Sequence, residues 1–173
     1  MLIRRLNDDS IEFADIEPVE AELLRQVSVI GDAQGDAGAE ARLFSAPADP
    51  SETQFLKDWE EYVRPELRHL FLAARKVVEE DVNTLSAKGG RFSRMVFPLS
   101  HGEAWLSALN QARLILAAKF DFAEAELALH EVPKTLTKRG LVLLQINFYA
   151  AIQERVIEAL QGEDDGYDAV DVG

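Results

Sequence analysis

The sequence predicts a mainly α (α+β) fold, in which helices surround a long C-terminal helix beside a minor sheet of two or three short strands. Four segments repeat apolar residues at helical spacing, namely 18–30, 51–85, 101–119 and 134–161. Strand-like alternation is confined to a few short stretches, too few for a parallel sheet. Apolar residues make up 47% of the 173 residues, enough to build a core without cysteine, which is absent.

The first 38 residues predict a strand, a helix and a loop. Residues 10–14 alternate polar and apolar side chains, which suits a half-buried strand. Pro18 can open a helix over 18–30, because a first-turn residue needs no N–H donor. Residues 31–38 contain three glycines without the spacing of a dinucleotide or phosphate loop, so we expect a solvated loop.

Residues 42–85 predict a further short strand and a helical region interrupted by proline. Residues 42–44 can form a second strand. A capping-box pattern at 51–54 then opens a helix that carries Phe55, Trp59 and Tyr62. Pro65 either ends or kinks this helix, or opens the next one, which continues to about residue 85.

The remaining elements follow a Lys-Gly-Gly break at 88–90. We expect a third strand over 92–97 and, after a second capping-box pattern at 100–103, a helix over 101–119. A short helix is predicted over 122–129. Pro133 precedes the longest helix, 134–161, whose centre is apolar nearly all round and is therefore expected to be buried.

The chain divides into one domain over 1–161 and an acidic C-terminal tail over 162–173. The tail carries five acids and no base. Its composition is typical of a disordered terminus.

Charge and composition restrict the partners. The net charge of −13 would repel nucleic acids and anionic membranes, whose recognition relies on lysine and arginine. The longest apolar-rich run has 12 residues, whereas a membrane span needs about 20. No targeting segment is recognisable, so we expect a cytoplasmic protein.

No catalytic signature, metal site or cofactor site is predicted. Glu66 and His69 match one half of a di-iron motif, but the motif requires a second copy that the sequence lacks. No serine lies in a nucleophile elbow. The acids at 79–81 lie near a helix C-terminus, where the helix dipole disfavours them, so they either mark a site or form a solvated face.

One cationic segment is the candidate for ligand contact. Residues 88–119 hold five bases and one acid, and the rest of the chain is acidic. Arg91, Arg94, Asn110 and Arg113 could hold an anion there, as in an enzyme or a small-ligand binder. Alternatively, the bases balance acidic neighbours inside the chain, and Asn110 and Arg113 form a polar lock that ties helix 101–119 to a neighbouring strand or loop carbonyl.

The favoured function is that of a non-catalytic interaction or regulatory protein. Trp59 and Tyr62 offer a partner surface, because such aromatics are enriched at binding hot spots. For Trp59, a place in the core is the favoured alternative. The opposite charges within the chain also predict a homodimer, which would have to rest on apolar burial.

Residues 105–116 carry the motif Trp-Leu-x-Ala-Leu-Asn-x-Ala-Arg-Leu-x-Leu, after Arg-Leu-Phe at 42–44 and Glu-Glu-Tyr-Val-Arg-Pro-Glu-Leu at 60–67. In this order the chain, from about 11 to 160, resembles the bacterial domain-of-unknown-function family numbered twenty-seventeen. The resemblance implies a bacterial cytosolic protein. Genes of this family often lie near that of the Clp protease adaptor, which implies a link to proteostasis. The family has no established catalytic residues to carry over.

Overall fold

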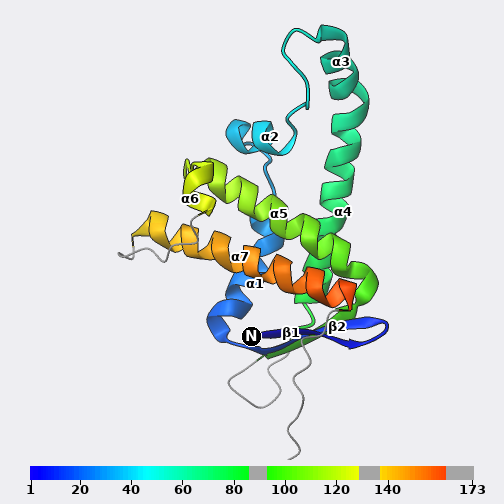
Figure 1. The fold of residues 1–173 in the computed structure, drawn as a ribbon, viewed down its shortest axis with the longest axis vertical. Helices are drawn as coiled ribbons and strands as arrows, with labels where there is room; N and C mark the ends of the chain where they lie inside the picture. The colour runs from blue at the N-terminus through cyan, green and yellow to red at the C-terminus, as the bar shows by residue number, and fades with distance from the viewer. Residues whose placement is uncertain (86–92, 129–136, 163–173) are drawn as a thin grey trace, which may run out of the picture.

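The computed structural model describes residues 1–85, 93–128 and 137–162, which form a small antiparallel sheet and a set of helices (Figure 1). The strands are β1 (Leu2–Asn7), β2 (Ser10–Ile16) and β3 (Ser93–Pro98). The helices are α1 (Pro18–Ile30), α2 (Ala37–Leu43), α3 (Thr53–Asp58), α4 (Arg64–Val82), α5 (Gly102–Lys119), α6 (Glu124–Ala128) and α7 (Lys138–Gln161). A π-helical turn, η1 (Trp59–Val63), joins α3 to α4, and a 3-10 turn, η2 (Leu99–His101), precedes α5. The predicted mainly helical α+β fold with a long C-terminal helix is confirmed.

The sheet has the order β1-β2-β3, and both pairs are antiparallel. The central strand β2 directs Ile11 and Phe13 into the core, where both are fully buried. Glu12 lies between them on the opposite face and pairs with Arg4 of β1 and Arg94 of β3. The strands predicted at 10–14 and 92–97 are confirmed over their described residues, and β1 is an addition.

Residues 42–44 do not form the predicted strand. Most of this segment belongs to α2, which begins after Asp36, whose carboxylate accepts a hydrogen bond from the Ala39 N–H at 2.9 Å. The cap satisfies a first-turn donor, and the following Ala, Glu, Arg and Leu all favour helix. These local preferences outweigh three strand-compatible residues.

The two predicted capping boxes are also absent. Ser51 donates its hydroxyl to Asp49, and the N-caps of α3 and α5 are Glu52 and His101, neither of which makes a side-chain cap bond. A capping box forms instead at the start of α1, between Glu17 and Glu20. At the start of α1, two carboxylates therefore make the pair of reciprocal bonds that defines a capping box.

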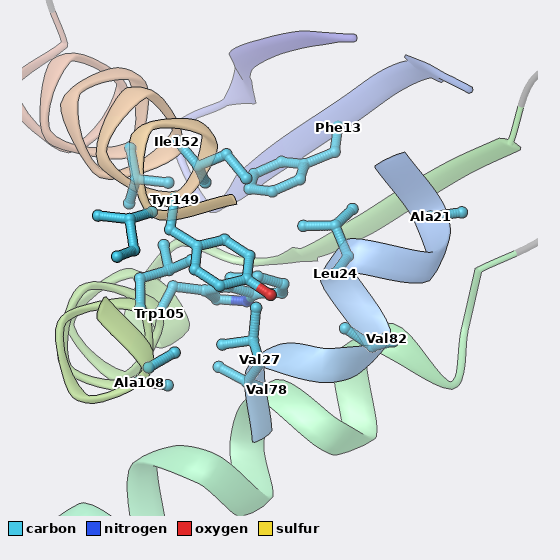
Figure 2. Close-up of a cluster of buried hydrophobic side chains, with 14 of the residues drawn as sticks. Phe13, Ala21, Leu24, Val27, Val78, Val82, Trp105, Ala108, Tyr149 and Ile152 are labelled. Atoms are coloured by element: carbon cyan, nitrogen blue, oxygen red, sulfur yellow. The ribbon is translucent and has the colours of Figure 1, made fainter. Parts of the chain in front are cut away.

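The core is built around Trp105 of α5, which is fully buried. Its ring centroid lies 5.2 Å from that of Phe13 and 5.3 Å from that of Phe97, so α5 packs on the buried face of the sheet. Side chains from β2, α1, α4, α5 and α7 converge on this cluster (Figure 2). Helix α5 contacts α1, α2, α4 and α7, which places it at the centre of the helical layer.

Helix α7 packs against both α5 and β1. Tyr149 of α7 is fully buried and donates its hydroxyl to the Leu23 carbonyl at 2.8 Å. Burial raises the pKa of this phenol to about 12. Near the other end of the contact, a Cβ on Gly102 would lie 2.6 Å from Leu160, so a side chain there would push the two helices apart.

The ends of several predictions lie outside the described residues. Helix α7 is described from Lys138, after the N-cap Thr137, so the predicted start at 134 is not covered. The acidic tail falls outside from residue 163 onward. None of the helices in the described part of the chain is both long and apolar enough to cross a membrane.

The ion pair between Glu126 of α6 and Arg139 of α7 predicts a loss of stability in acid. The two oxygens of Glu126 accept from Arg139 at 2.7 and 2.9 Å. These bonds, with one from the Ala123 N–H, lower the carboxyl pKa from 4.5 to about 2. A carboxyl whose folded pKa is depressed stabilises the fold fully above its unfolded pKa, and this stabilisation is lost as the pH falls from 4.5 towards 2.

Urea unfolding of the wild type and Glu126→Gln at several pH values checks this prediction. We expect the wild type to be the more stable at pH 7 and the difference to shrink below pH 4.5, with Glu124→Gln as the control on the same helix. A difference that stays constant with pH would contradict it.

Candidate functional site

One helical arm contributes no buried side chain to the core. Helix α3, η1 and the first half of α4 run on continuously, and α3 lies at the far end of the long axis from the sheet (Figure 1). No residue from 53 to 73, all of which the structure describes, is buried. The first buried residue of α4 is Ala74. We call residues 53–73 the arm.

Large apolar side chains are exposed along the arm. The exposed fractions are 43% for Phe55, 63% for Tyr62, 38% for Val63 and 58% for Leu70. Among the aromatic residues of the described ranges, only Phe55 and Tyr62 are exposed. Helices in proteins are usually stabilised by burying an apolar face, so the arm has apolar surface that the described chain leaves uncovered.

The two aromatics predicted as a partner surface have different surroundings. Tyr62 is exposed, and a hydrogen bond with Glu61 raises the pKa of its phenol. Trp59 is half-buried outside the main core: its Nε1 donates to the Phe44 carbonyl at 3.4 Å, and its ring stacks on Phe55 at 6.2 Å. Tyr62 is therefore available to a partner, whereas Trp59 also anchors the arm to α2.

The end of α2 supports the arm. Glu40 accepts from Arg68 at 2.7 Å and from Arg64 at 3.2 Å, and the Arg68 bond is the main reason why the carboxyl pKa is lowered. The Arg68 guanidinium also lies 4.7 Å from the centre of the Phe44 ring, within reach of a cation–π contact. Charge and aromatic contacts therefore hold the arm where apolar burial is missing.

Pro65 lies in the first turn of α4, as predicted for a proline that opens a helix, but α4 continues directly from η1. Proline has no N–H to donate and its ring crowds the preceding turn. The chain widens there into η1, in which the Arg64 N–H bonds to the Trp59 carbonyl, five residues earlier. The π turn lets the helix continue through the proline, and such turns recur at functional sites.

The arm is acidic as well as apolar. Residues 53–73 contain four carboxylates and three bases. Two of these bases, Arg64 and Arg68, are already paired with Glu40 of α2. The free surface of the arm therefore combines apolar groups with negative charge.

The four residues predicted to hold an anion are not joined into one site over the part of the chain that is described. Arg91 falls outside that part. Arg94 is bonded to Glu12, which is only 2% exposed. Burial raises the pKa of Glu12, but the bonds and charges of Arg4 and Arg94 outweigh burial and lower it. Arg94 therefore balances an acid within the sheet.

Asn110 is exposed, while Arg113 lies half-buried between α5 and α7. The Arg113 Nη1 donates to the Gln153 Oε1 at 2.5 Å, and Gln153 donates to the Leu106 carbonyl at 3.0 Å. Burial lowers the pKa of Arg113. These bonds form a polar link between two helices, where a strand or loop carbonyl had been the expected partner.

An open groove of about 570 Å³ lies beside Arg113. Its lining includes Glu154 and Glu158 as well as Arg113 and Asn147. Two carboxylates next to one partly satisfied guanidinium disfavour an anion. The geometry therefore gives little support to an anion site at Arg113.

A buried carboxylate, Asp81, connects α4 to the start of α5. It accepts from the Trp105 Nε1 at 2.9 Å, and both of its oxygens lie 3.0 Å from the His101 Nδ1. A carboxylate can orient a catalytic imidazole in this way, but catalysis would also need a nucleophile or a substrate proton at the other ring nitrogen. Within the described ranges, no hydroxyl is bonded to His101, so the network ties two helices together.

Comparison with known proteins places the chain in a family. The sequence profile described as "Domain of unknown function (DUF2017)" matches residues 2–160. The chain belongs to the DUF2017 family. No curated protein and no solved structure is significantly similar to it. The predicted family resemblance is thus confirmed.

Sequence reasoning missed several residues of this DUF2017 member. Glu40, which supports the arm, belongs to no motif, and the Arg-Leu-Phe motif that contains Phe44 gave no sign of its contact with Arg68. In the sequence, Asp81 stood out only as an acid near a helix C-terminus, where the helix dipole disfavours it. The structure shows that this carboxylate is buried. Over the described residues, no three histidine or carboxylate side chains come together as metal ligands.

Proposed function

We propose that this DUF2017 member is a non-catalytic interaction protein that binds a protein partner through the arm. The observation that supports the proposal is a 21-residue helical stretch with no buried residue and five exposed large apolar side chains, Phe55, Tyr62, Val63, Leu70 and Leu72. Binding would bury these side chains, and exposed aromatics are frequent hot spots. An amphipathic helix laid into an apolar groove is a common form of peptide recognition.

The charge of the arm specifies the partner more closely. The arm carries four carboxylates, and two of its three bases are already paired with Glu40, so its free surface favours a groove rimmed by lysine or arginine. Two arms of this charge would repel each other if they paired directly, so we favour a different protein over a second copy. The net charge of −13 disfavours nucleic acids and anionic membranes as partners. Action in the bacterial cytoplasm and the link to proteostasis stay predictions from the family resemblance.

A photo-reactive amino acid at position 62 tests the proposal in cells. Val29 of α1, which is 73% exposed, provides the control position away from the arm. We expect one defined protein to be cross-linked from position 62 and not from position 29. Cross-linking at twice the 19.3 kDa mass of the chain would instead indicate a homodimer.

The affinity of that partner then checks the chemistry. Tyr62→Ser should weaken binding at least about tenfold, because truncating an aromatic hot spot costs about 2 kcal/mol or more. Val29→Ser should leave it unchanged, and added salt should weaken wild-type binding. Equal losses in both variants, or cross-linking from both positions alike, would refute the arm as the binding surface.

A further inference from the structure

A cavity of about 220 Å³ lies at the base of the arm, where α4 meets the ends of α1 and α2 and the middle of α5. Apolar side chains form much of its wall: Leu43, Phe44, Phe71 and Leu72. The volume is below the range of about 300–1,000 Å³ that is typical of sites for drug-sized ligands. The space therefore suits a small metabolite.

Two residues that line this cavity each carry a buried polar atom without a partner. Gln111 is only 1% exposed; its Nε2 donates to the Ser107 hydroxyl at 3.1 Å, but its Oε1 accepts nothing. Arg75 is paired through Nη1 with Asp32 at 3.3 Å, but its Nε donates to nothing. Buried polar atoms in native proteins nearly always have a partner, so an acceptor and a cationic donor are left for a ligand.

The site holds Arg75 in place from both sides. Gly31 lies so close that a Cβ there would come within 2.8 Å of the Arg75 Cδ, and only a glycine leaves room for the arginine stem. On the other side, Asp32 accepts from the Gln34 N–H at 3.0 Å, which fixes the carboxylate that pairs with Arg75. The guanidinium is therefore oriented before any ligand arrives.

The unpaired donor of Arg75 is the feature of the cavity that favours a negative group. Arg68 and Arg75 both line the cavity, and each is paired with one carboxylate, Arg68 with Glu40 and Arg75 with Asp32. A carboxylate could accept the free Nε–H of Arg75, and an adjacent N–H or O–H could donate to the Oε1 of Gln111. The remaining wall would contact an aliphatic or aromatic body.

We propose that this cavity binds a small carboxylic acid with an apolar body and a hydroxyl or ammonium group next to the carboxylate. This class comprises the 2-hydroxy and 2-amino acids with branched or aromatic side chains. The inference goes beyond the proposed function and does not depend on it, because none of its steps requires a partner on the arm.

NMR titration of the full chain with 2-hydroxy-4-methylpentanoate tests the proposal. We expect saturable movement of the Arg75 Nε–Hε signal and of the Gln111 side-chain amide signals. Leu72→Trp should abolish this movement by filling the cavity. Leu70→Trp is the matched control, because Leu70 lies on the same helix, is exposed and does not line the cavity.

Three analogues separate the contributions of the ligand groups. The alcohol 4-methylpentan-1-ol, which lacks the carboxylate, should bind at least about tenfold more weakly, because hydrogen bonds to charged groups are the stronger ones. The acid without the hydroxyl, 4-methylpentanoate, should bind several-fold more weakly. Leucine in place of the hydroxy acid shows whether a hydroxyl or an ammonium is preferred.

The outcomes decide the proposal. Absence of shifts at millimolar concentration would mean that water alone occupies the cavity, and would overturn it. Equal binding of acid and alcohol, or unchanged binding by a folded Leu72→Trp variant, would overturn it as well. None of these results bears on the arm, whose test is cross-linking at position 62.

Discussion

Replacing Trp105 by alanine is expected to lower the free energy of unfolding by about 3–5 kcal/mol, the usual cost of truncating a buried aromatic to alanine. The indole is fully buried between the sheet and the helices, and it packs against the rings of Phe13 and Phe97. Removing it leaves a cavity among side chains of the sheet and of several helices, so the surrounding structure can collapse only in part.

Urea unfolding measures this loss, and the second tryptophan provides the control. Trp59 and Trp105 are the two tryptophans of the chain, and Trp59 lies half-buried outside the main core. Trp59→Ala should therefore cost much less than Trp105→Ala. The single-tryptophan variants also separate the fluorescence of core and arm. Equal losses of stability would contradict the assignment of Trp105 as the centre of the core.

Replacing Asp81 by alanine is expected to cost about 2–3 kcal/mol. Hydrogen bonds to charged groups contribute roughly 1.5–3 kcal/mol, and a buried donor left without its acceptor adds a desolvation penalty. The indole N–H of Trp105 would lose its acceptor in this variant, and the ring of His101 would lose its carboxylate partner. Asp81→Asn should cost less, because its carbonyl oxygen can still accept from the indole.

The exposed neighbour Glu80 supplies the control for Asp81. Glu80→Ala removes a carboxylate from the same helix end and should change the free energy of unfolding by less than about 0.5 kcal/mol. A double-mutant cycle with Trp105→Phe, which removes the indole N–H but keeps an aromatic ring, should show coupling of at least about 0.5 kcal/mol. Additive losses would show that the Asp81–Trp105 bond contributes nothing specific.

The two largest effects concern the core, whereas the functional proposals concern the arm and its base. Changes in stability and changes in binding can therefore be measured in different variants. Tyr62→Ser and Leu72→Trp alter residues that are more than a third exposed, so they should change binding without unfolding the chain. A loss of partner binding in Trp105→Ala would reflect unfolding alone.

Local sequence patterns were sufficient for most helices and for the class of the fold. Helix α1 has the predicted bounds, and α5 differs from its prediction by one residue at its start. In both, the apolar spacing and the residues at the ends act within a few turns of the chain, so a linear pattern contains the necessary information. The strand predicted over 92–97 followed from another local feature, a short apolar-rich run before Pro98.

Local sequence patterns did not predict the strand β1 or the helix α2. Residues 2–7 include Arg4 and Arg5, and they become a strand because β2 offers a pairing partner and Glu12 a partner for Arg4. Three residues at 42–44 are too few for periodicity to distinguish strand from helix. Pairing with a distant segment decided β1, whereas the cap at Asp36, outside the three residues, decided α2.

Only the tertiary structure decided which polar and apolar faces are buried. The spacing of Phe55, Trp59 and Tyr62 predicted a helix with an apolar face, but the described part of the chain leaves much of that face exposed. Asp81 lies at a helix end like its exposed neighbours, yet the start of α5 covers it. Local preferences set backbone conformation through contacts a few residues apart, whereas burial depends on which remote elements come together, and this is why helices could be predicted and sites could not.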